Sequence, residues 1–346
     1  MTPASATGST LTGSAPRFEV GFKRLAPGVW AWLQPNGAWG EANAGLVAGD
    51  GASLLVDTLW DERLAGEMLA AAAELEAPPI RVVVNTHSDG DHWWGNGVVP
   101  AESTIVTSQA SARAMAAEAA PQELARLARL TARGRRLPGR MGTLSRYTAG
   151  MLAPFQFARV HPRRPDATFA ETKTLEVGGR EVRLTLVGPA HTPGDLIVHV
   201  PDAAVVFAAD VLFVNATPVM WHGPIENWLR ALDTLIELEA DTYVPGHGPD
   251  CGVDGVRAFR ELMERIRDGA LECHHAGLGA QAATRRMLAG EELAELRGWE
   301  CPERLYITVA ALYRGFEGAK RLPTTPLGRA RVFAVVGRIA QELEHG

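Results

Sequence analysis

Short apolar runs alternate with amphipathic segments over the first two-thirds of the chain, and this pattern predicts a mixed α/β fold. Alternating or continuous apolar runs of roughly four to eight residues, bounded by turn residues, are typical of strands. The expected strands are 18–23, 29–33, 44–48, 53–56, 81–85, 103–107, 173–177, 181–187, 196–200, 204–208 and 242–244.

Helices are predicted where apolar residues recur at helical spacing. In the first two-thirds of the chain they cover 61–76, 108–117, 121–133 and 225–239. Glycine, proline and arginine punctuate 134–165, which we therefore interpret as a loop-rich insertion. From residue 252 onward the strand signals nearly vanish, and helices are expected at 253–274, 278–288, 302–316 and 326–344. We expect a tail over 1–17, an α/β domain over 18–250 and a helical extension over 251–346.

Composition narrows the class of protein. The chain has 346 residues, of which 46% are hydrophobic and 21% charged, as is usual for a globular protein with a large core. A net charge of −6 offers no basic surface for nucleic acid. The sequence also contains no apolar run of about 18 residues, the length that a membrane-spanning helix needs. Residues 1–17 resemble a disordered tail more than a secretory signal. Because Cys251, Cys273 and Cys301 also show no paired spacing, we expect a cytoplasmic location.

Histidine and aspartate gather in four short clusters, each of which follows an apolar, strand-like run. The clusters contain His87, Asp89, Asp91 and His92, then His191, then Asp210, and finally His247. Strand ends commonly carry binding residues on loops held by a rigid sheet. Imidazole and carboxylate are ligands of Zn²⁺, Mn²⁺ and iron. An isolated histidine, such as His161 or His199, is usually structural, but this ordered set predicts a metal site.

The same clusters resemble the motifs of a known family. His-Ser-Asp-Gly-Asp-His at 87–92, Ala-His-Thr-Pro-Gly around His191, Asp210, and Pro-Gly-His-Gly around His247 resemble the ordered motifs of the metallo-β-lactamase superfamily. Leu-Leu-Val-Asp-Thr at 54–58 resembles its early strand motif, and the resemblance covers roughly 18–249. It implies an α/β fold of the αββα type, with metals at one sheet edge, to which the helical extension predicted from the apolar pattern would be added. The resemblance says less about the substrate than about the fold and the metal site, because proteins with this fold catalyse many different reactions.

The resemblance also implies two divalent metal ions, with zinc as the first expectation. His87, Asp89 and His191 would hold one ion, Asp91, His92 and His247 the other, and Asp210 would bridge them. The family pattern has a second histidine where Asp89 stands, although the flavodiiron branch has glutamate there and binds iron. Asp89 either binds a metal directly, supports the site from outside, or leaves the first position weakly occupied. In each case iron and manganese become stronger rivals to zinc.

Two metals of this kind lower the pKa of a shared water and polarise a carbonyl group. We therefore expect a metal-dependent hydrolase in which metal-bound hydroxide attacks a carboxylic ester, thioester or lactone. The resemblance implies that Asp91 also orients the nucleophile or moves its proton. The alternatives are a non-hydrolytic iron or manganese enzyme, either redox or cyclase, and β-lactam hydrolysis. No nucleotide-binding or serine-hydrolase motif competes with these interpretations.

Aromatic residues next to the ligand motifs are candidates for the substrate site. The candidate substrate-binding residues are Trp93, Trp94, Trp221 and His222, although the first two could equally pack in the core. Asp57 is a candidate to orient a ligand histidine. The arginines between 133 and 140 fit a solvated face better than an anion site. We expect a small-molecule substrate and no nucleic-acid or membrane partner, with a homodimer as the candidate assembly.

Overall fold

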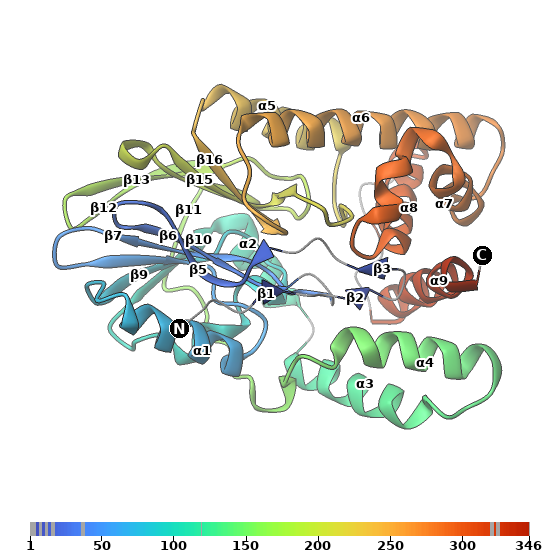
Figure 1. Cartoon of the computed structure of the whole chain (residues 1–346), viewed down its shortest axis with the longest axis horizontal. Helices are drawn as coiled ribbons and strands as arrows, with labels where there is room; N and C mark the ends of the chain where they lie inside the picture. The colour runs from blue at the N-terminus through green and yellow to red at the C-terminus, as the bar shows by residue number, and fades with distance from the viewer. Residues whose placement is uncertain are drawn as a thin grey trace.

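The computed structural model describes residues 5–6, 9–10, 13–14, 18–35, 39–118, 120–318, 322 and 326–345. Two β-sheets lie face to face with helices on both outer sides, and further helices gather at one end (Figure 1). The predicted αββα architecture with C-terminal helices is confirmed. Most of the expected tail over 1–17 lies outside the described residues. The part of it that is described forms the two-residue strands β1 (Ser5–Ala6), β2 (Ser9–Thr10) and β3 (Gly13–Ser14).

The first sheet has seven strands in the order β11-β10-β9-β8-β7-β6-β5. Neighbours from β5 to β8 are antiparallel, and those from β8 to β11 are parallel. The short strand β4 (Phe18–Glu19) pairs with β1 instead. The bounds of the seven strands are β5 (Gly21–Ala26), β6 (Val29–Leu33), β7 (Ala44–Ala48), β8 (Ser53–Val56), β9 (Ile80–Val84), β10 (Thr104–Ser108) and β11 (Ala167–Phe169).

The second sheet has five strands in the order β12-β13-β14-β15-β16. Only its last pair, β15 with β16, is parallel. Strand β15, next to the edge strand β16, is buried along its whole length, as its continuous apolar sequence predicts. The bounds are β12 (Thr172–Val177), β13 (Arg180–Leu186), β14 (Leu196–Val200), β15 (Val205–Phe213) and β16 (Thr242–His247).

Side-chain alternation builds the core between the sheets. In β8, Leu54 faces the second sheet, whereas Leu55 packs towards the outer helix layer. In β15, Phe207 faces the first sheet and Val206 the outer helices. The sheets approach so closely that a Cβ at Gly45 would lie 2.1 Å from the Phe207 ring. Glycine at position 45 therefore permits this packing.

Helices cover both outer faces of the sandwich (Figure 1). Helix α1 (Glu62–Glu74) packs Met68 against the first sheet, and its start is capped by the Asp61 side chain, which accepts a hydrogen bond from Leu64 N. Helix α5 (Ile225–Glu237) packs Trp228 against the second sheet, next to α6 (Val253–His275). Helix α2 (Gln109–Ala117) follows β10.

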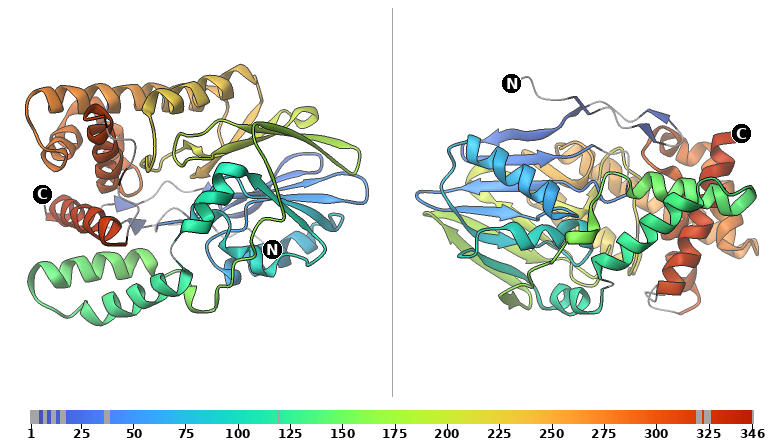
Figure 2. Two further views of the ribbon diagram at one scale, coloured as in Figure 1. Left: turned by 180° about the vertical axis from the view of Figure 1, so that it is seen from behind. Right: turned by 90° about the horizontal axis from the view of Figure 1, so that it is seen from below.

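The expectation of a loop-rich segment over 134–165 is wrong for Gly139–Leu152, whereas 153–165 is irregular apart from the 3-10 turn Phe157–Arg159. Helix α3 (Pro121–Gly134) is followed by a second helix, α4 (Gly139–Leu152), and Figure 2 shows the pair lying alongside the C-terminal helix α9 (Pro326–His345). Tyr147 and Met151, four residues apart on α4, are buried in the main core. Burial of this face stabilises a helix whose glycines and arginines gave only a weak helical signal.

The C-terminal helices predicted from the sequence are present. Besides α6 and α9 they are α7 (Ala280–Ala289) and α8 (Leu305–Phe316). Helix α8 is fastened to the sandwich, because the Thr308 hydroxyl donates to Pro218 O at 2.8 Å and accepts from Met220 N at 3.1 Å. The division at residue 250 into two domains stays a prediction. Among the described helices, none is both long and apolar enough to cross a membrane.

Candidate metal centre

The predicted metal ligands come from four segments that end at the same side of the sandwich. The loop after β9 carries His87, Asp89, Asp91 and His92, the last two within a 3-10 turn, Gly90–His92. His191 lies in the turn between β13 and β14, and His247 is the last residue of β16. Strand β15 continues past its predicted end, so that Asp210 lies within this strand and not in a loop after it.

Asp210 lies at the centre of the histidines. Its carboxylate oxygens are 3.1 Å from His92 Nε2 and 3.3 Å from His191 Nε2. The corresponding distances are 3.5 Å to His247 Nε2 and 4.0 Å to His87 Nε2. A single carboxylate within reach of all four imidazoles has the position required of a bridging ligand.

The donor atoms fall into two sets of three, within which all atoms lie less than 4.8 Å apart. One set is His87, Asp89 and His191, and the other is Asp91, His92 and His247. A third group joins His87 and His92 to Asp210. The structure thus brings together all seven residues singled out from the sequence, and Asp89 Oδ2 lies 3.1 Å from His191 Nε2. Their role as metal ligands stays a prediction.

Each of the four histidines bonds through Nδ1, so that Nε2 is directed into the cluster. His92 Nδ1 lies 2.8 Å from Asp57 Oδ2, and His87 Nδ1 lies 3.0 Å from the Thr86 hydroxyl. His191 Nδ1 donates to Val219 O, and His247 Nδ1 donates to Glu41 O at 3.2 Å. Such outer bonds select the tautomer and the ring orientation of a metal-binding histidine. Asp57, predicted as an orienting group, occupies this position.

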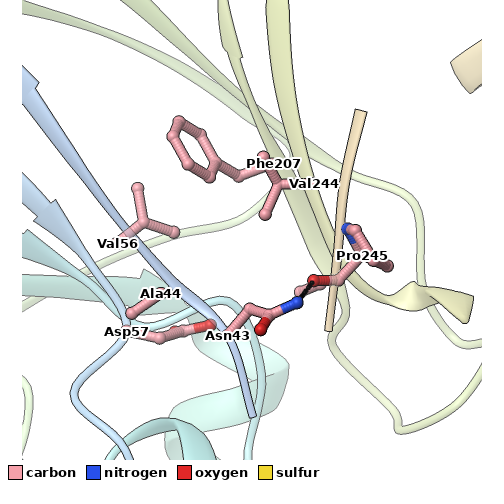
Figure 3. A pocket seen from close by; sticks show the side chains of 8 residues that line it. Asn43, Ala44, Val56, Asp57, Phe207, Val244 and Pro245 are labelled. Carbon is pink, nitrogen blue, oxygen red and sulfur yellow. Dashed lines mark hydrogen bonds between the residues drawn. The ribbon is translucent and has the colours of Figure 1, made fainter. Parts of the chain in front are cut away.

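Asn43 connects the two sheets near the cluster, and Asp57 lies close to it. Asn43 Nδ2 donates to Pro245 O at 3.0 Å and to Gly248 O at 2.7 Å, which ties the start of β7 to the loop bearing His247. Figure 3 shows both side chains beside a small cavity between the sheets. A Cβ at Gly246 would lie 1.8 Å from Asp210 Oδ1, so only glycine lets β16 approach the central carboxylate.

The electrostatics of the cluster favour cations. Although burial opposes it, the imidazoles of His247, His92 and His191 hold the pKa of Asp210 well below its usual range. Despite burial, a hydrogen bond from His191 lowers the pKa of Asp89 to about 2. Burial together with the neighbouring His92 lowers the pKa of His87, which keeps that imidazole neutral. Although burial opposes it, Asp210 raises the pKa of His92, and raises that of His191 to about 10, so these two imidazoles must lose a proton when a metal ion binds.

Unpartnered atoms give an independent test of this fit. His87 Nε2, His92 Nε2 and Asp210 Oδ1 are buried and have no hydrogen-bond partner among the described residues. Unpaired polar atoms in a protein interior are costly, and a coordinated cation would satisfy all three. The donor chemistry, spacing and unpartnered atoms therefore fit a pair of divalent ions.

The tryptophans after the ligand loop are buried, in line with the core alternative. Trp93 and Trp94 are only 3% and 2% exposed. Their indole N–H groups donate to Glu118 Oε2 at 3.0 and 3.2 Å, and Gly90 N donates to Glu118 Oε1 at 3.1 Å. These hydrogen bonds to Glu118 hold in place the loop after β9, which carries four of the candidate metal ligands. Both rings also line a cavity of about 340 Å³, so a substrate contact stays a prediction.

Trp221 and His222 lie beside the turn that carries His191. Their backbone N–H groups both donate to His191 O, at 3.1 and 3.2 Å. The Trp221 ring is half-buried and packs against Phe333 of α9, whereas His222 Nδ1 donates to Gly223 O.

The sequence analysis did not predict a role for Glu118 or Asp195. The Asp195 carboxylate accepts hydrogen bonds from Ala190 N and Thr192 N beside His191. Nothing local distinguishes these two acids from surface acids.

Two stacked sheets with a histidine–aspartate cluster at their edge define a class of metal-binding α/β sandwich proteins. The family model for the metallo-beta-lactamase superfamily matches residues 37–247. This chain belongs to the metallo-beta-lactamase superfamily.

Individual relatives are distant. The chain is 23% identical over 239 residues to the 2,4-dinitroanisole O-demethylase subunit alpha of Nocardioides sp. (strain JS1661), covering 67% of this chain and 60% of that protein. It is 26% identical over 117 residues to the linear primary-alkylsulfatase of Pseudomonas sp. (strain ATCC 19151), covering 32% of this chain and 21% of that protein. The chain thus spans less than two-thirds of the length of either curated relative.

The fold resembles that of a solved sec-alkylsulfatase from Pseudomonas sp., with a TM-score of 0.61 and 19% identity. The likeness covers 87% of this chain and 50% of that one. At this identity, the comparison establishes a shared fold.

Proposed function

We propose that this chain is a metal-dependent hydrolase that cleaves an ester bond in a small molecule. The observation that carries the proposal is the pair of three-residue donor sets joined at Asp210. A carboxylic ester, thioester or lactone is the substrate class expected from the chemistry of such a site. Two relatives are named for an O-demethylase and an alkylsulfatase, which adds sulfate esters to the bonds worth testing.

His87, Asp89 and His191 would hold one metal ion, and Asp91, His92 and His247 the other, with Asp210 shared between them. When bound, such a pair acidifies water and polarises the bond under attack. Zinc is the first expectation, and iron or manganese are the rivals that the carboxylate of Asp89 favours.

The side chains of Asp89 and Asp91 are the most exposed of the ligand set. They are 22% and 13% exposed, against 5% for Asp210 and 0% for His92. Substrate therefore approaches past these two carboxylates. Burial raises the pKa of Asp91, which brings its proton affinity closer to that of a general base working near neutral pH. We assign to Asp91 the task of orienting the attacking water and accepting its proton.

The test measures the hydrolysis of a nitrophenyl ester, a thioester, a lactone and an alkyl sulfate by metal-loaded protein. Replacing Asp91 with asparagine should lower turnover of the best substrate by about 10²–10⁴, because the amide cannot accept a proton. Asp254→Asn, which removes a carboxylate that is 94% exposed, is the matched control and should leave turnover unchanged. Activity that survives chelation, or an Asp91 variant within about tenfold of the parent, would overturn the proposal.

A further inference from the structure

Most of the large hydrophobic side chains that remain exposed gather in one part of the molecule. Among the described residues there are six of them, and four belong to helices α3 and α4, which with their connecting turn form a hairpin over residues 121–152. These four are Leu127, Leu130, Leu137 and Met141, of which Leu130 and Met141 are the most exposed, at 65% and 67%. Leu343, a fifth, lies in the last turn of α9. Figures 1 and 2 show this end of α9 at the same end of the molecule as the turn of the hairpin.

Other side chains of the hairpin anchor it to the rest of the chain. The Tyr147 hydroxyl of α4 donates to Glu303 Oε1 at 2.6 Å, and a Cβ at Gly337 of α9 would lie 2.9 Å from Leu144 Cδ1. On α3, Ala125 is buried in the main core. The hairpin is therefore a fixed part of the fold, whereas its exposed apolar side chains are covered by nothing in the part of the chain that the structure describes. Exposed apolar side chains gathered on one element mark a site of interaction.

The hairpin is also strongly basic, although the protein is acidic. It contains seven arginines and one glutamate, a net charge of +6, whereas the whole chain has a net charge of −6, so that the rest of the chain carries −12. The arginine side chains that the structure describes here are all exposed: Arg126, Arg129, Arg133, Arg135, Arg136 and Arg146. None of them takes part in an ion pair with another described residue, and Arg129 and Arg146 donate to backbone oxygens instead. The positive charge is therefore free to attract an anionic partner.

An anionic lipid surface matches both properties of the hairpin. Arginines are attracted to the phosphates at the headgroup level, and apolar side chains of the same helices enter the boundary with the acyl chains. Nucleic acid would bind the arginines but leave the apolar side chains in water, and the one aromatic residue of the hairpin, Tyr147, is buried and cannot stack on a base. A second copy of the chain, paired through the same face, would bring two basic hairpins together, and their like charges would repel.

We propose that the hairpin of α3 and α4 binds the surface of an anionic lipid bilayer. Its arginines face the lipid phosphates, and Leu130 and Met141 enter the boundary between headgroups and acyl chains. This assignment differs from the sequence-based expectation of no membrane partner, which considered a spanning helix and the charge of the whole chain. Contact with one face of a bilayer needs only a local surface that is both basic and apolar. The proposal does not depend on the hydrolase function.

Sedimentation with lipid vesicles tests the proposal on the full, zinc-loaded chain. The probes are vesicles of phosphatidylcholine alone and vesicles of phosphatidylcholine mixed with phosphatidylglycerol. We expect the chain to bind the mixed vesicles at least about tenfold more tightly than the neutral ones, because each arginine near an anionic surface adds to the attraction. Raising the salt from about 0.1 M to about 1 M shortens the Debye length from about 10 Å to about 3 Å, and should weaken binding to the mixed vesicles.

Two paired substitutions separate the basic from the apolar contribution. Arg133→Gln combined with Arg136→Gln should weaken binding to the mixed vesicles about 10- to 30-fold. Leu130→Gln combined with Met141→Gln should weaken it at least about tenfold, because the glutamine side chains do not enter the apolar boundary. All four side chains are exposed, so both variants should melt like the parent.

Matched controls carry the same kinds of change outside the hairpin. Arg257→Gln combined with Arg286→Gln removes the same charge from two exposed arginines of other helices. Val98→Gln replaces the exposed apolar residue that lies away from the hairpin and from α9. Both controls should bind the mixed vesicles like the parent.

The outcomes separate a lipid surface from the other partners. Equal binding to neutral and mixed vesicles, or equal affinity in the hairpin variants and their controls, would overturn the proposal. Absence of vesicle binding would overturn it as well, and a dimer in sedimentation velocity that Leu130→Gln with Met141→Gln dissociates would then assign the hairpin to a second copy of the chain. Ester hydrolysis enters none of these measurements, so failure of the membrane contact and failure of the proposed function are seen separately.

Discussion

Replacing Asp57 with asparagine would test how far metal binding depends on residues that orient the ligand histidines without binding the metal themselves. Asp57 Oδ2 accepts hydrogen bonds from His92 Nδ1 at 2.8 Å and from the Thr86 hydroxyl at 2.7 Å, while Oδ1 accepts from Thr86 N at 2.8 Å. The backbone of Asp57 has a φ of 61°, a left-handed conformation that asparagine also tolerates. The substitution therefore alters the hydrogen bonding while preserving the shape of the chain.

The expected loss of metal affinity follows from the donor count. An asparagine amide has one acceptor and one N–H₂ donor, so whichever way it turns, a donor faces either Thr86 N–H or His92 Nδ1–H. Leaving a buried donor unsatisfied costs about 1–3 kcal/mol. Changes to groups that orient a ligand histidine typically weaken metal binding about 10- to 100-fold. We expect a loss of this size for the ion held by His92, and a smaller loss for the ion held by His87, whose Nδ1 reaches Asp57 only through the Thr86 hydroxyl.

Competitive chelation with a zinc indicator measures the two binding steps separately. The control is Asp61→Asn, which alters another buried carboxylate that accepts from Leu64 N at 2.7 Å and Gln156 N at 2.7 Å, with no bond to a ligand candidate. It should lower the melting temperature without changing zinc affinity. Equal zinc affinity in the Asp57→Asn variant and the parent would refute the orienting role of Asp57.

Three further predictions concern other parts of the molecule. Asp89→His should shift competitive loading towards zinc over iron or manganese, because imidazole is the softer ligand, and an unchanged metal ratio would show that Asp89 does not bind metal. Burial raises the pKa of Glu300 to about 8, so the folded chain holds this proton more tightly than the unfolded chain and loses stability as pH rises from about 4.5 through 8. Glu300→Gln should therefore reduce the fall in melting temperature between about pH 6 and about pH 9, and an undiminished fall would contradict this. Ending the chain at Cys251 removes α8 and its Thr308 bonds, and should give aggregated or inactive protein, whereas a soluble and fully active product would make the extension dispensable.

The strands were the easiest elements to predict. The bounds 29–33, 44–48, 53–56 and 196–200 agree with β6, β7, β8 and β14 to the residue. These strands lie between two packed layers, where one or both faces must be apolar, so their sequence pattern reports burial directly. The four ligand clusters were equally visible, because each lies in or directly after an apolar, strand-like run.

Features that depend on contacts between distant segments were missed. Helix α4 forms because Tyr147 and Met151 pack into the core, a tertiary effect that outweighs its three glycines, Gly139, Gly142 and Gly150. Glu118 lies 28 residues after the glycine whose N–H it accepts, and Arg329 lies 108 residues after the Trp221 ring that it covers. No local periodicity encodes either contact, since both arise only when α2 and α9 dock at the ligand edge.

Anomalous diffraction from crystals of the metal-loaded protein tests the central claim most directly. The account predicts two peaks about 3.5–4 Å apart. One should lie about 2.0–2.2 Å from donor atoms of His87, Asp89 and His191, and the other at the same distance from Asp91, His92 and His247, with Asp210 touching both. A single ion, or ions bound away from Asp210, would contradict the two-metal site from which the proposed function is derived.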